Sequence, residues 1–128
     1  MEKFPIILGG VKKQTEEIIS VRFPYTGEVY AQVCQAGTSD LKTAVTEAVK
    51  GFEITKKLSS GARARILTRL ADEIHRRGDE LAEVMVMEGG KTRKFAISEV
   101  ARAELTVRTS AEGSKADLWR DHSAGLER

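Results

Sequence analysis

The chain has 128 residues, enough for one domain and too few for an enzyme with separate cofactor and substrate lobes. Its 21 basic residues are interleaved with 19 acidic ones, so the net charge of +2 gives no indication of a nucleic-acid partner. A single cysteine excludes an internal disulfide and suits a cytoplasmic location, and no apolar run is long enough to cross a membrane.

The first predicted element is a β-hairpin over about residues 17–36. Residues 18–23, Ile-Ile-Ser-Val-Arg-Phe, and residues 29–34, Val-Tyr-Ala-Gln-Val-Cys, are rich in the β-branched and aromatic residues that favour strands. Between them Pro24 fixes one turn dihedral and Gly27 can adopt a positive one, which favours a turn. Because an isolated hairpin is only marginally stable in water, we expect it to dock on another element.

Amphipathic helices are predicted after Gly37, where the hydrophobic period changes from two to about 3.6 residues. Four are expected, over about residues 39–58, 62–77, 79–88 and 93–115. The last dozen residues, 117–128, lose the periodicity and are predicted to be irregular. The sequence therefore predicts an α+β fragment in which an N-terminal hairpin precedes about four helices.

Helix ends are predicted from capping residues. Ser39 is the expected N-cap of the first helix, and Asp40 would place a negative charge at its positive end. Gly89 and Gly90 are expected to end the third helix, because glycine readily takes the left-handed conformation in which the chain leaves a helix.

The run Gly90-Lys91-Thr92 raises the question of a phosphate-binding loop. Such a loop needs Gly-x-x-x-x-Gly-Lys-Ser/Thr between a buried strand and a helix. The first glycine would fall at position 85, which is Met85, and residues 81–88 read as helix rather than strand. We therefore interpret the run as a corner between two helices, with Thr92 as the expected N-cap of the second.

Other candidates for chemistry have structural interpretations that we favour. Cys34 has no histidine nearby in sequence, so a structural thiol is favoured over a nucleophile. His75 and His122 lack metal-ligand spacing, and His75 is expected to be solvated. One predicted helix carries five arginines, but acidic residues mixed among them favour a salt-bridged face over an RNA-binding one. They are Arg63, Arg65, Arg69, Arg76 and Arg77.

A series of short segments carries more information than any one of them. In chain order they are Pro24-Tyr25-Thr26-Gly27-Glu28-Val29, the helix with Ala44-Val45 and Ala48, Arg63-Ala64-Arg65-Ile66-Leu67 with Leu70-Ala71, Glu88-Gly89-Gly90-Lys91, and Ser98-Glu99-Val100-Ala101-Arg102-Ala103. Their order and spacing resemble the N-terminal portion of the NAD(P)-dependent aldehyde dehydrogenases. The first is similar to that family's Asn-Pro-x-x-Gly-Glu-Val, the fourth to Glu-Thr-Gly-Lys-Pro and the last to Glu-Val-x-Arg-Ala. The chain departs from this pattern at Phe23, Gly89 and Thr92, where the family has Asn, Thr and Pro.

The resemblance implies the start of a Rossmann-like cofactor domain. In the full-length enzyme, NAD or NADP would accept a hydride after a cysteine thiolate attacks an aldehyde, which is oxidised to an acid. The resemblance places the catalytic residues beyond residue 128, so we expect no catalytic, cofactor-binding or metal residue, no bound cofactor and no activity in this chain alone. Its expected partner is the remainder of the dehydrogenase polypeptide, with no nucleic acid and no membrane.

One residue is a candidate for substrate binding. In the branch of the family that acts on phosphorylated glyceraldehyde, an arginine in Ser-Glu-Val-x-Arg contacts the substrate phosphate, and Arg102 holds that position. A guanidinium binds phosphate oxygens bidentately. A structural arginine is the favoured alternative, because the residue is common across the family. The competing hypothesis for the whole chain is a non-catalytic helical module that self-associates through uncovered apolar faces.

Overall fold

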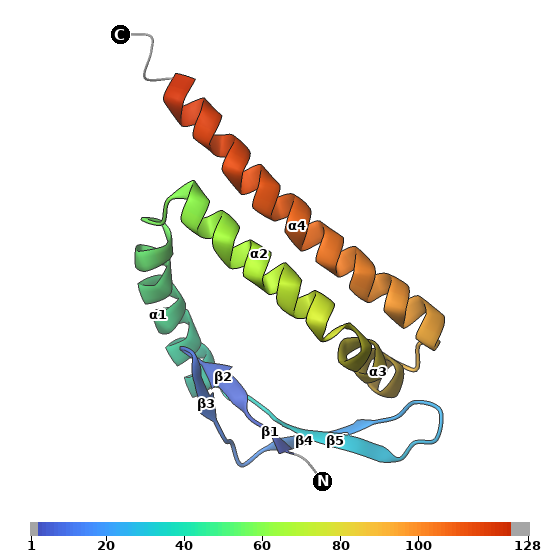
Figure 1. The fold of residues 1–128 in the computed structure, drawn as a ribbon. Coiled ribbons are helices and arrows are strands. Elements are labelled where there is room, and N and C mark those ends of the chain that lie inside the picture. The colour runs from blue at the N-terminus through green and yellow to red at the C-terminus, as the bar shows by residue number, and fades with distance from the viewer. Residues whose placement is uncertain (1–2, 124–128) are drawn as a thin grey trace. The chain divides into compact units, whose positions relative to one another are not determined.

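In the computed structural model the backbone is described for residues 3–123 and the side chains for residues 3–115. The elements are β1 (Lys3–Phe4), β2 (Ile6–Leu8), β3 (Val11–Lys13), β4 (Ile18–Arg22), β5 (Val29–Cys34), α1 (Thr38–Thr55), α2 (Ser60–Arg76), α3 (Gly78–Gly89) and α4 (Arg93–Ser123) (Figure 1). Two compact units result. One comprises the chain up to Lys57 with Met87–Gly90, and the other comprises Leu58–Val86 with the chain from Lys91 onward.

The predicted hairpin is confirmed. Strands β4 and β5 pair antiparallel, with Ile18 opposite Cys34 and Ser20 opposite Gln32. Gly27 in the connecting turn has a φ of 76°, a conformation that glycine adopts without steric cost. The hairpin also gains the support that its size requires, because β1 pairs parallel with β5 and makes a three-stranded sheet in the order β1-β5-β4.

The three strands before residue 17 are absent from the sequence prediction. Strands β2 and β3 form a second small hairpin, in which Ile6 lies opposite Lys13. Its turn contains Gly9 and Gly10, whose φ angles are 58° and 83°. Two consecutive positive φ angles are typical of a tight hairpin turn, so the Gly-Gly pair was an available signal. Strands of two or three residues are too short to show an alternating pattern.

The prediction of four helices is confirmed, with differences at their ends. Helix α1 begins after Gly37, so the expectation that Ser39 is its N-cap is wrong. Ser59 caps α2 by accepting a hydrogen bond from the Ala62 N–H at 3.2 Å. In α4 the first helical bond runs from the Ala96 N–H to the Thr92 carbonyl, which puts Thr92 at the N-cap position.

Helix α4 is longer than predicted. Irregular chain was expected over 117–128, but the helix continues to Ser123, so that prediction is wrong for 117–123. Residues 117–123 include no proline or glycine, and Leu118 and Arg120 have high intrinsic helix propensity, which needs no apolar periodicity. Residues 124–128 lie outside the described part of the chain.

The core of the second unit is built from small side chains. Helices α2 and α4 lie side by side and antiparallel (Figure 1). Small residues on both helices are almost completely buried, and small side chains allow two helix backbones to approach closely: Ala64, Ala71, Ala96 and Ala111. With Ala82 of α3, Val100 of α4 completes the buried cluster, which half-buried apolar side chains surround. No large side chain among the described residues is fully buried.

Candidate functional site

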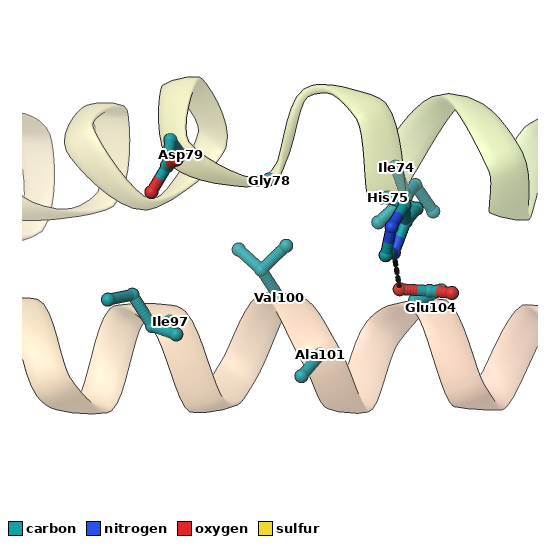
Figure 2. A pocket seen from close by; sticks show the side chains of 8 residues that line it. All are labelled: Ile74, His75, Gly78, Asp79, Ile97, Val100, Ala101 and Glu104. Carbon is teal, nitrogen blue, oxygen red and sulfur yellow. Dashed lines mark hydrogen bonds and ion pairs between the residues drawn. The ribbon is translucent and has the colours of Figure 1, made fainter.

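A groove of about 230 Å³ opens within the second unit, between the α2–α3 junction and α4 (Figure 2). Its apolar wall comes from Ile74, Ile97 and Val100, and Val100 points toward Gly78, which has no side chain to block it. Figure 2 shows His75 of α2 and Glu104 of α4 pointing toward one another at the rim. Because α2 and α4 run antiparallel, residues 29 positions apart in sequence meet here.

Every charged group around Glu104 has a partner. His75 Nδ1 lies 3.0 Å from Glu104 Oε2, and Arg108 Nε donates to Glu104 Oε1 at 2.9 Å. Arg108 also pairs with Asp72 of α2 at 3.0 Å. The hydrogen bond from His75, followed by that from Arg108, lowers the pKa of the Glu104 carboxyl. A carboxylate held in its charged form by two donors is a poor general acid or base at neutral pH, so we interpret this network as a tie between helices.

The network was missed by the sequence analysis. His75 was expected to be solvated, and three-quarters of its side chain is indeed exposed, but it also contacts Glu104. No local motif encodes the pairing, because it depends on the register between two helices.

Arg102, the predicted substrate-binding residue, lies exposed on α4 and does not line the groove. Within the described residues, no hydrogen bond or ion pair engages its guanidinium. The pKa of the Glu99 carboxyl is lowered mainly by a hydrogen bond from Lys91 and to a smaller extent by the charge of Arg102. The structure therefore leaves Arg102 accessible to an anion.

Cys34 lies buried on β5 and has the surroundings of a structural thiol. The Thr15 N–H donates to its Sγ at 3.4 Å, and Sγ donates to Gln14 Oε1 at 3.2 Å. The hydrogen bond from Thr15 lowers the pKa of the thiol, but only 3% of the residue is exposed. No histidine among the described residues contacts it, so neither access for a substrate nor a proton acceptor is present.

The corner at Gly90 is not a phosphate-binding loop. It follows helix α3 rather than a strand, and the Lys91 ammonium is paired with the Glu99 carboxylate. Gly90 has a φ of 64° and ends the helix as predicted. A Cβ on Gly90 would lie 3.3 Å from Pro24 Cβ, so the corner packs directly against the turn between β4 and β5.

Two of the five arginines lie at the α2–α3 junction and pair with acidic residues three positions away along the chain. Arg76 Nε donates to Glu73 at 2.9 Å, and Arg77 Nε donates to Glu80 at 2.8 Å. These contacts support the salt-bridged interpretation for Arg76 and Arg77. Among the described residues, no three or more His, Cys, Asp and Glu side chains gather where they could hold a metal ion. In the same part of the chain no helix is long and apolar enough to span a bilayer.

The β5–α1 connection leads from a strand into the N-terminus of a helix, which is the kind of place where a nucleotide phosphate can bind. Here the Asp40 carboxylate accepts a hydrogen bond from the Gly37 N–H at 3.0 Å and pairs with the Lys13 ammonium at 2.6 Å. The Lys13 contact, followed by the Gly37 bond, lowers the pKa of Asp40. A permanent negative charge at the helix N-terminus opposes phosphate binding, so these residues do not fit a dinucleotide.

Comparison with known proteins gives a consistent match. The sequence profile of the aldehyde dehydrogenase family matches residues 11–122. The mitochondrial succinate-semialdehyde dehydrogenase of Arabidopsis thaliana is 31% identical over 111 residues, which are 85% of this chain and 21% of that protein. The chain spans about a fifth of the length of the curated relatives it matches.

Solved structures agree with the sequence match. The chain is similar to aldehyde dehydrogenase 21 of Physcomitrella patens, solved with the reaction product succinate, with a TM-score of 0.84 and 29% identity. The similarity covers 88% of this chain and 24% of that one. An NAD-dependent aldehyde dehydrogenase of Sinorhizobium meliloti gives a TM-score of 0.82 at 25% identity, over 89% of this chain and 24% of that one.

Proposed function

Because this chain belongs to the aldehyde dehydrogenase family, we propose that it forms the N-terminal part of the cofactor-binding domain of an NAD(P)-dependent enzyme that oxidises an aldehyde to an acid. The observation that carries the proposal is a family match over most of the chain, combined with coverage of only about a fifth of the relatives. In the complete enzyme, NAD or NADP would accept the hydride released when a cysteine-bound aldehyde adduct is oxidised.

This chain's own residues supply a scaffold rather than the chemistry. Cys34 is buried without a base, and the turn at Gly37 is occupied by the Asp40 carboxylate. Glu104, one of two acidic residues that line the groove, is held as a carboxylate by two donors. The chain alone should therefore neither bind the dinucleotide nor oxidise aldehydes. The single thiol, Cys34, is in keeping with a cytoplasmic protein.

The proposal is tested by grafting this chain in place of the matching segment of the Arabidopsis thaliana relative. Absorbance of the reduced cofactor measures turnover of succinate semialdehyde, with NAD and NADP assayed separately. Activity in the graft, and none in a host that lacks the segment, is the expected outcome. A soluble graft without activity would argue against the proposal, and turnover by the isolated chain would refute its predicted inactivity.

Arg102 has two candidate roles, a structural one, which we favour, and contact with an anionic substrate. Its guanidinium is exposed and unpaired among the described residues, which supports the role in contacting an anionic substrate. In the active graft, Arg102→Ala would then raise KM for an anionic aldehyde and leave KM for a neutral one unchanged. Equal effects on both substrates would assign Arg102 the structural role.

The alternative function is a non-catalytic module that associates with itself. Its supporting observation is the exposure of many large apolar side chains, including Phe52, Phe95 and Leu105. Light scattering on the isolated chain distinguishes the two cases. Discrete dimers or higher oligomers favour self-association, and a monomer argues against it.

A further inference from the structure

One face of α1 is apolar and exposed along its whole length. Leu41, Val45, Val49 and Phe52 are spaced four, four and three residues apart, which places them on one side of a helix. Between 57% and 63% of each residue is accessible to solvent. We call these four residues the α1 apolar face. Burial of an amphipathic helix face normally drives helix packing, so a face this exposed lacks its partner.

The α1 apolar face continues into a groove at the start of the helix. This groove, of about 450 Å³, is lined by β2 and by the first turns of α1, including Leu41 and Ala44. Ile7 at its edge is 72% exposed. The polar group there, Asp40, is already paired with Lys13. The groove therefore offers apolar surface to an occupant and no unpaired buried charge.

Two ion pairs lie along α1 and its C-cap, and one of their members, Lys56, also places its ammonium 5.7 Å from the centre of the Phe52 ring on the face. Lys50 pairs with Glu47 at 2.7 Å, and Lys56 pairs with Glu53 at 2.5 Å. Because the charges of these two pairs are satisfied by neighbours along the helix, nucleic acid or a charged peptide gains little from them. An apolar protein surface fits the α1 apolar face best.

We propose that the α1 apolar face is the surface on which the rest of the dehydrogenase polypeptide docks, through an apolar surface of its own. This rests on the proposed function. About four-fifths of the Arabidopsis thaliana relative lies outside the segment matched here, since that segment is 21% of the protein. A contiguous apolar stripe on a soluble protein is normally covered. The part of the relatives that lies outside the matched segment is the polypeptide that would cover it.

The direct test is chemical accessibility, which does not depend on activity. Val49→Cys on the face and Thr46→Cys away from it are made in the isolated chain and in the graft described above. Maleimide labelling at each position is followed by peptide mass spectrometry. We expect Val49→Cys to react at least about tenfold more slowly in the graft than in the isolated chain, and Thr46→Cys to react equally in both. Equal Val49→Cys rates in the two proteins would overturn the proposal.

A pair of aspartate substitutions on the face, with a matched pair elsewhere on α1, provides a second test. Val45→Asp with Val49→Asp alters the face, whereas Thr43→Asp with Thr46→Asp adds the same charge elsewhere on α1. Valine, threonine and aspartate have similar helix propensities, so both pairs should leave the helix content of the isolated chain unchanged. In the graft we expect the face pair alone to reduce soluble, folded protein by about tenfold or more.

The results separate this proposal from its alternatives. Face and control pairs that behave alike in the graft would overturn docking while leaving the proposed function intact. A dimeric isolated chain that the face pair converts to monomer would identify a second copy as the occupant, and would also overturn it. A graft that is inactive but protects Val49→Cys would support docking and count against the proposed function.

Discussion

The corner at Gly90 provides the most stringent test of the structure, through the substitution Gly90→Ala. Gly90 has a φ of 64°, a left-handed conformation that costs a non-glycine residue about 1–2 kcal/mol. Alanine also reduces the conformational entropy of the unfolded chain, which stabilises the folded protein by about 0.4–1 kcal/mol. The conformational part of the change therefore destabilises the protein by about 0–1.6 kcal/mol.

A second contribution comes from contact with the hairpin turn. The new methyl group would lie 3.3 Å from Pro24 Cβ and 3.4 Å from Pro24 Cγ, closer than ordinary carbon–carbon packing. The proline ring is rigid and has to shift, which adds on the order of 1 kcal/mol. We expect a total loss of about 1–2.6 kcal/mol in the free energy of unfolding.

Two further substitutions separate these contributions. Gly10→Ala introduces a residue at a φ of 83° with no atom within 4 Å of the new Cβ, so only the conformational cost applies. Pro24→Gly removes the ring, and in that background Gly90→Ala should lose about 1 kcal/mol less than it does alone. Urea unfolding followed by circular dichroism measures all four variants. If Gly90→Ala destabilises no more than Gly10→Ala, or if its cost is the same without Pro24, the inferred contact is wrong.

Three other predictions follow from the same structure. Gly51 lies inside α1 with open space around its Cα, so Gly51→Ala should raise the free energy of unfolding by about 0.5–1 kcal/mol in the same urea assay, and destabilisation would contradict that environment. Asp40 has a lowered pKa in the folded chain, so its stabilising effect is present above its unfolded pKa and is lost as pH falls through its folded pKa. Asp40→Asn should lower the free energy of unfolding at pH 7 and weaken its decrease below about pH 4. An unchanged decrease at acid pH would exclude this role of Asp40. Buried Cys34 should react with maleimide at the rate of global unfolding, and rapid labelling of the native chain would show that the β5 thiol is accessible.

The elements with strong local signals were predictable from the sequence. Proline and glycine mark the turn at residues 24–27, and the change of hydrophobic period after Gly37 marks the first helix. The short strands before residue 17 have no such periodicity, and β1 is stabilised by pairing with β5, about 29 residues further along the chain. Pairing over such a separation depends on the fold and cannot be recognised from a two-residue strand.

Helix ends and side-chain networks were harder to predict for a different reason. Ser39 has the better N-cap side chain, yet Gly37 takes the position, because Asp40 caps the helix from its third residue by accepting the Gly37 N–H. The tie between His75 and Glu104 depends on how α2 and α4 are aligned, which their individual patterns do not specify. Arg102 could be named from the family resemblance alone, since its exposed position on α4 has no distinguishing local feature.

The run at residues 88–91 illustrates how a family marker acquires a physical meaning. Together with Thr92, its Gly90 and Lys91 raised the question of a phosphate-binding loop, which the preceding helix and the Lys91–Glu99 pair exclude. Its glycine Gly90 instead lies where any side chain would press on Pro24, in the first of the five segments that resemble the family. Two of those segments are therefore in contact, 66 residues apart in sequence. A side chain at Gly90 would disturb the helix end and the hairpin turn together, which is a sufficient physical reason for glycine at this corner.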